Sequence, residues 1–307
     1  MSDGALVSQS RDVLSHHARS FRWGAFFLPE GAHDDAAVTY AFCRLVDDVV
    51  DEAPSEQAAS EGVEALEAEL RGDALPSALV RGFSQVMLRD GGSLEAAFEL
   101  IKGVRSDLDE QILQDEAELL TYAYRVAGTV GLMMCQVLRV EDARAIPHAI
   151  DLGIGMQLTN IARDVKEDAE RGRVYIPATV LARVGLSSSD ILDGTADPRK
   201  LAQAVQWLYE TGEAYYQSAE QGMRFIPWRS RLAIYVASRT YRGIGVKLAR
   251  NGFNAMAGRT IVPWFEKMFW VGHGLTSAIR SLFASRYLEH RPTLHEALRE
   301  LPGANKG

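Results

Sequence analysis

The sequence contains few cysteines and prolines, and this scarcity limits the folds that it can adopt. Only 2 of its 307 residues are cysteine, Cys43 and Cys135, and both lie in apolar patterns with helical spacing. We therefore expect two reduced, buried thiols rather than a disulfide. The 10 prolines are scattered, and no linker rich in glycine, serine and proline divides the chain. These features predict a single domain over residues 1–307.

Long apolar runs are also missing. The most apolar window, residues 126–138, is shorter than the roughly 20 residues that a membrane-spanning helix needs. The first residues, MSDGALVSQSRDVL, contain no apolar segment of the kind found in secretory signals. The sequence therefore predicts a cytoplasmic protein. The aromatic segment 259–286 leaves an alternative open, because it suits either the core or a peripheral contact with a membrane surface.

The chain has no excess of positive charge and no strand-like pattern. Its net charge of −8 gives no support to a nucleic-acid partner, because such proteins usually present a basic patch. Apolar residues recur instead at spacings of three and four between glycine or proline breaks. This pattern predicts an all-α fold, with helices over 55–71, 76–90, 93–105, 107–138, 143–168 and 201–222.

One stretch, QLTNIARDVKEDAERGRVYIP at 157–177, carries polar residues where a buried helix would not need them. Asn160, Asp164 and Asp168 are four residues apart, so they share one helix face. Asparagine and aspartate are poor residues for a helix interior, because their side chains compete for the backbone. Their oxygens suit a hard cation such as Mg²⁺. A solvated polar face is the alternative interpretation of this segment alone.

A second stretch, YAFCRLVDDVVDE at 40–52, repeats the pattern. Asp47 and Asp51 are again four residues apart in an apolar helical pattern, although like charges at that spacing destabilise an isolated helix. If two such aspartate pairs on different helices face one another, a cation is needed between them to offset the repulsion of their charges. Asp34 and Asp35, upstream of this stretch, are predicted to cap its helix.

The two aspartate motifs do not stand alone. Together with YAYRVAGTVG at 122–131 and RTYRGIGVKL at 239–248, they resemble the squalene/phytoene synthase family, and within it bacterial phytoene synthases. The resemblance is strongest over 17–262. It implies a single-domain helical bundle of the isoprenoid-synthase type with a central apolar cavity.

The resemblance also implies roles for individual residues. Mg²⁺, or Mn²⁺ in its place, would be held by Asp47, Asp51, Asn160, Asp164 and Asp168. Tyr122 would lie near the reacting centre. The prenyl diphosphate substrates would be bound by His17, Arg19, Ser20, Phe21, Tyr40, Arg44, Gln157, Asn160, Arg163, Arg171, Arg173, Tyr241 and Arg259. Many relatives have Ser-Lys-Ser/Thr-Phe-Tyr where this chain has Ala-Arg-Ser-Phe-Arg at 18–22, so one hydroxyl contact is missing.

The resemblance implies a head-to-head condensation of two geranylgeranyl diphosphates. The reaction would pass through a cyclopropylcarbinyl diphosphate to phytoene, would depend on Mg²⁺ and would need no reductant, as a step of carotenoid biosynthesis. One alternative is a sister enzyme that uses farnesyl diphosphate and makes dehydrosqualene, squalene or presqualene diphosphate. A second is a helical assembly protein without activity, against which the four motif aspartates count.

Small and flexible residues favour the longer substrate. Small residues would leave volume for a long prenyl tail, and flexible methionines would adapt to its shape. The small residues are Ala127, Gly128 and Gly131, and the methionines are Met133 and Met134. Close packing between helices explains the small residues equally well. The sequence fixes neither the tail length nor the oligomeric state.

Overall fold

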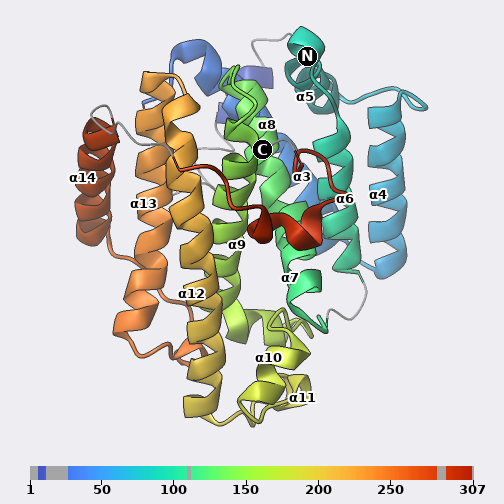
Figure 1. Ribbon diagram of the computed structural model, residues 1–307. Helices are drawn as coiled ribbons and strands as arrows, with labels where there is room; N and C mark the ends of the chain where they lie inside the picture. The colour runs from blue at the N-terminus through green and yellow to red at the C-terminus, as the bar shows by residue number, and fades with distance from the viewer. Residues whose placement is uncertain (1–5, 12–26, 109–111, 282–287, 306–307) are drawn as a thin grey trace.

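The molecule is built from helices that run roughly along one direction (Figure 1). The structure is a computed structural model that describes residues 6–11, 27–108, 112–281 and 288–305. Its helices are α3 (Glu30–Asp51), α4 (Glu56–Arg71), α5 (Ala78–Met87), α6 (Glu95–Ser106), α7 (Glu116–Ala123), α8 (Thr129–Val137), α9 (Ala145–Glu170), α10 (Ala178–Arg183), α11 (Ser188–Leu192), α12 (Pro198–Gly222), α13 (Trp228–Arg250) and α14 (Trp264–Ser281). The described residues contain no strand, only an isolated bridge between Ile112 and Val174. The all-α prediction is confirmed.

Helix α9 lies at the centre of the bundle, between α8 on one side and α12 and α13 on the other (Figure 1). Its 26 residues bury apolar side chains in several directions, among them Ile150, Ile154 and Leu158. A helix that is apolar on most of its circumference is stable only when other helices surround it. The second aspartate motif is therefore carried by the most enclosed helix of the fold.

Two glycines let α8 and the preceding turn approach α9 closely. A Cβ atom on Gly131 would lie 2.1 Å from the carbonyl oxygen of Ala149, and one on Gly153 would lie 2.2 Å from that of Ala127. Neither contact is tolerable, because the obstacle in each case is backbone. Both interpretations of Gly131 are therefore supported, because this glycine admits the backbone of α9 and also lines an apolar cavity. A larger residue there would separate two core helices.

The single helix predicted over 107–138 is wrong. Helix α6 ends at Ser106, and α7 begins only after Asp115, whose carboxylate accepts a hydrogen bond from the Glu118 amide (3.0 Å). The N-cap explains the new start, since aspartate satisfies a free amide of the first turn. Between α7 and α8 the helix widens into a π-helical turn, η2 (Tyr124–Gly128).

The predicted caps of α3 are also wrong. The helix begins earlier, at Glu30 after Pro29, so Asp34 and Asp35 lie inside it. Their carboxylates pair with arginines from elsewhere, Asp34 with Arg11 (2.5 Å) and Asp35 with Arg89 (2.5 Å). Aspartate can therefore occupy a helix interior when an ion pair from another segment engages it.

The C-terminal segment crosses the bundle and is fastened to it by polar contacts. Its 3-10 helix η5 (Pro292–Leu298) lies beside α9 and α7 in Figure 1. Tyr124 donates a hydrogen bond to the Pro302 carbonyl (2.6 Å), and Tyr215 donates to that of Leu294 (2.8 Å). These bonds attach the last turns of the chain to η2 and α12.

The centre of this attachment is Asp151 of α9, whose side chain is fully buried. Its two oxygens lie 3.0 Å from Nε2 of His290 and 2.8 Å from Nε2 of His295. Burial alone would raise the pKa of Asp151, but the two histidine contacts hold the pKa below its usual value. The carboxylate therefore stays ionised and fastens the C-terminal segment to α9.

We predict that Asp151→Asn weakens the whole fold. Hydrogen bonds to a charged group each contribute about 1.5–3 kcal/mol, so losing two should lower the free energy of unfolding by about 3 kcal/mol or more. Urea denaturation at pH 7 measures this, and limited proteolysis should release the C-terminal segment first. Asp142→Asn is the control, because Asp142 pairs with Arg144 at the surface. Equal stability of the two variants would show that the Asp151 contacts contribute little.

Candidate active site

The four motif aspartates meet in one cavity between α3 and α9. This polar cavity has a volume of about 320 Å³. Its walls carry carboxylates, arginines, amides and two tyrosines: Asp47, Asp51, Asp107, Tyr122, Gln157, Asn160, Arg163, Asp164, Asp168, Arg171, Arg173 and Tyr175. The structure therefore brings together residues from motifs that lie more than a hundred positions apart in the chain.

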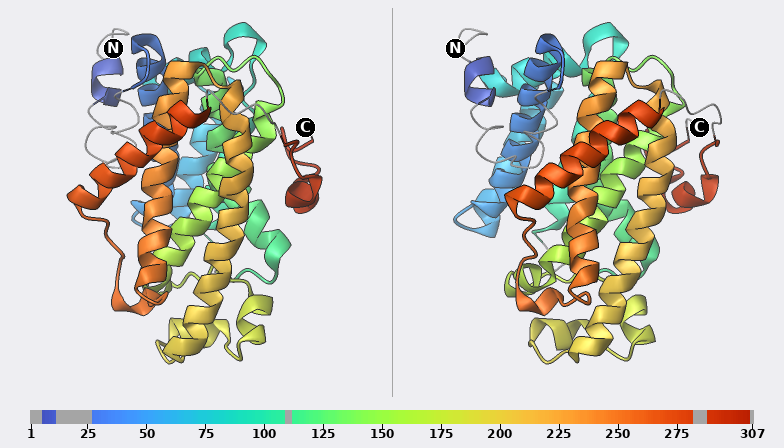
Figure 2. Two further views of the ribbon diagram at one scale, coloured as in Figure 1. Left: turned by 60° about the vertical axis from the view of Figure 1, so that its left-hand side comes forward. Right: turned by 90° about the vertical axis from the view of Figure 1, so that its left-hand side faces the viewer.

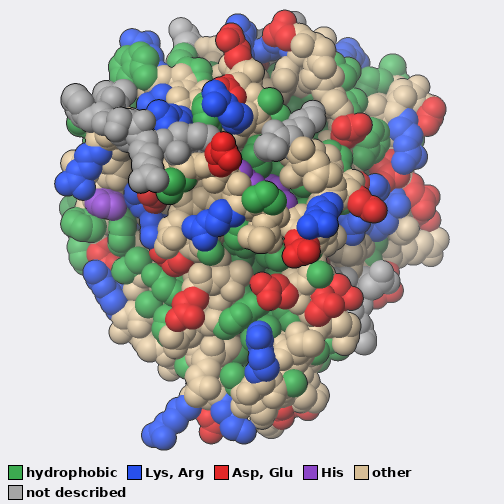
Figure 3. Space-filling model, viewed as in Figure 1, with side chains coloured by type: hydrophobic (Ala, Val, Ile, Leu, Met, Phe, Trp, Pro, Cys, Tyr) green, Lys and Arg blue, Asp and Glu red, His purple; other side chains and the backbone are tan. Residues whose placement is uncertain are grey.

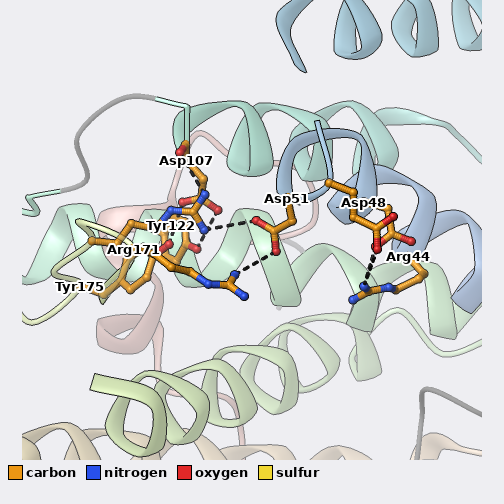
Figure 4. A network of polar contacts seen from close by, with 9 residues as sticks. Arg44, Asp48, Asp51, Asp107, Tyr122, Arg171 and Tyr175 are labelled. Carbon is orange, nitrogen blue, oxygen red and sulfur yellow. Dashed lines mark hydrogen bonds and ion pairs between the residues drawn. The ribbon is translucent and has the colours of Figure 1, made fainter. Parts of the chain in front are cut away.

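Helix α3 aims its aspartates in two directions. Phe42, Val46 and Val50 are buried in the core and orient the helix, which places Asp47 and Asp51 on the adjoining face. Asp48 does not line the polar cavity and pairs with Arg44 (2.5 Å), as Figure 4 shows. Arg44, which the sequence placed among the substrate-binding residues, thus lies beside the site and is engaged by Asp48.

Helix α9 supplies the opposite wall. Arg163 donates two hydrogen bonds to the carboxylate of the adjacent Asp164, one of them at 2.7 Å. Arg259, from the chain beyond α13, lies 3.3 Å from the same carboxylate. Two guanidinium groups therefore meet at Asp164, while Asp168 has no ion pair among the described residues within 4 Å.

The turn after α9 brings two more arginines across the cavity. Gly172 has a φ of +76°, a conformation that favours glycine, and it reverses the chain directly after the helix. Arg171 and Arg173 then reach Asp51 of α3 at 3.3 Å and 3.4 Å (Figure 4). The second motif is thereby connected to the first through charge.

Two residues of the cavity were missed by the sequence analysis. Asp107 follows α6 and accepts hydrogen bonds from Tyr122 (3.2 Å) and Tyr175 (2.9 Å), whose rings stack at 4.7 Å (Figure 4). Arg173 also donates to the Asp107 carbonyl (3.2 Å). Asp107 was expected only as part of the helix predicted over 107–138, so its place in the site is a correction.

Several of these carboxylates are strained by burial and by one another. Burial, followed by the charges of Asp51 and other carboxylates, raises the pKa of Asp47 to about 7. Burial and the nearby Asp164 raise the pKa of Asp168 to about 7, and burial raises that of Asp107 to about 6. The neighbouring arginines lower these pKa values, but by less than burial and the other carboxylates raise them. The cavity therefore favours additional positive charge.

The donor atoms fit a hard cation. All side chains that could ligate an ion offer oxygen, which Mg²⁺ prefers. Oδ1 of Asn160 is buried and has no hydrogen-bond partner among the described residues, although such atoms are nearly always satisfied. Asp151, His290 and His295 form another cluster of potential ligands, but their mutual distances are those of hydrogen bonds, so they need no ion.

A second, apolar cavity opens from the polar one. Its volume is about 340 Å³, and Asp47, Gln157 and Asn160 line both cavities. Tyr40 and Tyr241 lie on its wall near this junction. The other walls are apolar residues of α3, α8, α9 and α13, with Met134, Leu138, Ala149, Met156, Ala233 and Ala237 among them. The two cavities together can hold a molecule with an anionic head and a long apolar tail.

Four of the predicted substrate-binding residues cannot be placed. His17, Arg19, Ser20 and Phe21 lie outside the described residues. Of the others, Tyr122, Gln157, Asn160, Arg163, Arg171 and Arg173 line the polar cavity, Tyr40 and Tyr241 line the apolar one, and Arg259 touches Asp164.

Known proteins are similar to this chain in sequence and in fold. The squalene/phytoene synthase family model matches residues 14–266. A 15-cis-phytoene synthase of Enterobacter agglomerans is 34% identical over 90% of this chain and 95% of its own, and one of Synechocystis sp. is 32% identical over 85% and 82%. Among solved structures, a dehydrosqualene synthase in complex with ligand has a TM-score of 0.81 at 25% identity, covering 91% of this chain and 98% of its own. A squalene synthase of Alicyclobacillus acidocaldarius has a TM-score of 0.71 at 22% identity and covers 81% of this chain and 95% of its own. This second similarity concerns the fold alone.

We predict that Asp47→Asn stabilises the protein at pH 8 in the presence of EDTA. The folded-state pKa of Asp47, about 7, lies above the unfolded value of about 3.9, so its cost to folding is full above pH 7 and declines as the pH falls toward 4. The neutral amide should gain about 1–3 kcal/mol at pH 8 and less at pH 5.5.

Urea denaturation at the two pH values measures this gain. Asp34→Asn, which removes the surface ion pair with Arg11, should change stability by less than about 1 kcal/mol at either pH. A variant Asp47→Asn that is less stable than the wild type at pH 8 would contradict the account of strained carboxylates.

Proposed function

The chain belongs to the squalene/phytoene synthase family and is an enzyme of the prenyltransferase type, and we propose that it condenses two geranylgeranyl diphosphates head to head to phytoene. One observation carries the proposal: a cavity of carboxylates and arginines opens, through Asp47, Gln157 and Asn160, into an apolar cavity. A diphosphate head and a prenyl tail need these two environments side by side. Phytoene formation is a step of carotenoid biosynthesis.

The motif residues would hold the metal ions that the diphosphate needs. Asp47, Asp51, Asp164 and Asp168 offer carboxylate oxygens, and the unpartnered Oδ1 of Asn160 offers an amide oxygen. When bound there, Mg²⁺, or Mn²⁺ in its place, supplies positive charge that offsets the departing diphosphate.

The arginines would bind the phosphate oxygens directly. Arg171 and Arg173 engage Asp51, and Arg163 and Arg259 engage Asp164. With their carboxylate partners engaged in holding cations, these guanidinium groups would be free to turn their donors to the diphosphate, for which their planar fork is well suited. The arginines are thus held close to the place where negative charge develops.

The reaction proceeds in two ionisations. In the first, the C–O bond of one substrate breaks, its allylic cation is attacked by the double bond of the other, and loss of a proton closes a cyclopropylcarbinyl diphosphate, prephytoene diphosphate. In the second, that diphosphate leaves, the cation rearranges and a proton is lost, so no reductant is consumed. Both cations must be kept from water, which the apolar wall with Tyr40, Met156 and Tyr241 would do.

The length of the apolar cavity supports the twenty-carbon substrate. The α9 residues on its wall form one stripe: Ala145, His148, Ala149, Leu152, Gly153, Met156, Gln157 and Asn160. From position 145 to position 160 a helix extends about 22 Å at about 1.5 Å per residue. With carbon–carbon bonds of about 1.5 Å, an extended geranylgeranyl tail reaches roughly 20 Å and a farnesyl tail roughly 15 Å. The farnesyl diphosphate reaction, giving dehydrosqualene or squalene, remains the second candidate.

The product also implies a partner. Phytoene is a hydrocarbon without a polar group, so it must leave the enzyme for an apolar phase. We propose a peripheral contact with a membrane for this release. Among the described residues, no helix combines the length and the apolar character needed to cross a bilayer.

We predict that the purified protein converts geranylgeranyl diphosphate to phytoene without NADPH. The activity should vanish in excess EDTA and return with Mg²⁺. Asp47→Asn should lower the rate at least about a hundredfold, since it removes a proposed ligand, whereas Asp34→Asn should leave it near that of the wild type. Product analysis by chromatography with each prenyl diphosphate decides the question. Turnover of farnesyl diphosphate alone would favour the second candidate.

A second prediction concerns the far end of the apolar cavity. Ala145→Phe should fill that end and slow geranylgeranyl diphosphate more than farnesyl diphosphate, because overpacking a tight site costs about 1–3 kcal/mol, or roughly 5- to 150-fold. Ala143→Phe is the matched control, since Ala143 is exposed two positions earlier. The ratio of kcat/KM for the two substrates is the measurement. An unchanged ratio in Ala145→Phe would place the tail elsewhere.

A further inference from the structure

The outward face of α14 carries large apolar side chains. Trp264 is 76% exposed, Phe265 59%, Met268 44%, Phe269 65% and Ile279 55%. These five residues are called the α14 stripe below. Figure 3 shows hydrophobic side chains at the left-hand edge of the molecule, where Figure 1 places α14. A row of large exposed apolar side chains of this kind on one helix usually marks an interaction site.

The stripe is not needed to pack α14 onto the protein. The opposite face of the helix buries Val271, Gly274 and Ala278 against its neighbours. A Cβ atom on Gly274 would lie 2.9 Å from Cα of Val236, so α14 already lies in close contact with α13. The helix is therefore apolar on both faces. The second apolar face needs a partner outside the described part of the chain.

The charges around the stripe fit an anionic surface. Glu266 is the sole acidic residue between positions 261 and 281, and it is paired with Lys247 (3.0 Å). Arg280 is exposed at the C-terminal end of α14. This distribution contrasts with the net charge of −8 for the whole chain. A negatively charged bilayer would meet apolar and basic groups on this face and no unpaired carboxylate.

Exposed residues at the start of α13 extend this face. Arg231 lies 3.4 Å from Ser281 at the end of α14, so the first turn of α13 adjoins that end. In this turn Trp228 is 61% exposed, and the guanidinium of Arg229 lies 5.7 Å from the centre of its ring. Tryptophan with arginine is a common combination at the level of lipid headgroups.

The stripe also lies close to the apolar cavity. Figure 2 shows α14 crossing the outer side of α13. Ala233, Ala237 and Tyr241 of α13 line the cavity, while Val236 and Gly243 of the same helix contact α14. One helix therefore separates the cavity wall from the exposed stripe.

We propose that the α14 stripe is the surface by which this protein docks onto an anionic lipid bilayer. The helix lies in the plane of the interface, with its aromatic side chains among the headgroups and acyl chains and Arg229 and Arg280 at the phosphates. The docking stands on the exposed side chains and their charges. Its purpose, the delivery of a hydrocarbon product, rests on the proposed function.

Vesicle sedimentation of the full chain tests the docking without any substrate. Wild type should bind vesicles of phosphatidylcholine and phosphatidylglycerol (3:1) at least tenfold more tightly than the triple variant Trp264→Ser, Phe265→Ser, Phe269→Ser. Pure phosphatidylcholine and added salt should both weaken binding. The control is Leu75→Ser with Leu88→Ser, which removes two exposed apolar residues (88% and 51%) elsewhere and should bind as the wild type does.

Equal binding of the triple variant and the wild type would overturn the proposal. A wild type that ignores vesicles but elutes as a dimer, while the triple variant elutes as a monomer, would also overturn it and assign the stripe to a second copy of the chain. Phytoene formation in detergent micelles is measured in parallel and should be the same in both proteins. If the wild type forms no phytoene in micelles, the proposed function is refuted, and the result of the vesicle-binding experiment is unaffected.

Discussion

Burial of several carboxylates side by side governs the site, because burial and then mutual repulsion both disfavour their charged forms. Asp47 and Asp51 on α3 face Asp164 and Asp168 on α9, and Asp107 adds a fifth negative group to the same cavity. The neighbouring arginines pair with Asp51 and Asp164, whereas burial, followed by repulsion between carboxylates, raises the pKa of Asp47 and of Asp168 to about 7. Such an arrangement is tolerated where function repays its cost to stability. It explains why an anionic diphosphate together with divalent cations would fit a site that is itself rich in carboxylates.

Helix α9 carries both the polar and the apolar part of the site and fixes the distance between them. Its C-terminal half carries Asn160, Asp164 and Asp168, and its cavity-facing stripe continues to Ala145. On another side, Asp151 fastens the C-terminal segment, while Gly153 of the cavity-facing stripe also admits the backbone of η2. Because one rigid helix supports the polar head site and the apolar wall, the distance between them is fixed by the helical rise. In the proposed complex, a tail of given length would be measured against this constant reference.

The sequence allows prediction of what one helix determines by itself. Asp47 with Asp51, and Asn160 with Asp164 and Asp168, could be identified because a spacing of four places them on one face. Contacts between distant segments could not be predicted in this way. Asp107 and Tyr175 are 68 positions apart and meet only in the folded chain. Asp34 resembled a cap because aspartate is common there, yet the distant Arg11 stabilises it inside α3. The helical spacing of apolar residues likewise continued across 107–115 and predicted one helix there, whereas the N-cap Asp115 starts a new helix.

In the proposed complex, cations and a diphosphate share the cavity between α3 and α9 while the tail follows α9. A crystal structure with Mn²⁺ and a non-reacting thio analogue of geranylgeranyl diphosphate tests it most directly. The account predicts anomalous peaks within bonding distance of carboxylates from both motifs, with the tail extending from Asn160 toward Ala145. Manganese at the Asp151 cluster, or a tail that leaves the apolar cavity empty, would contradict it.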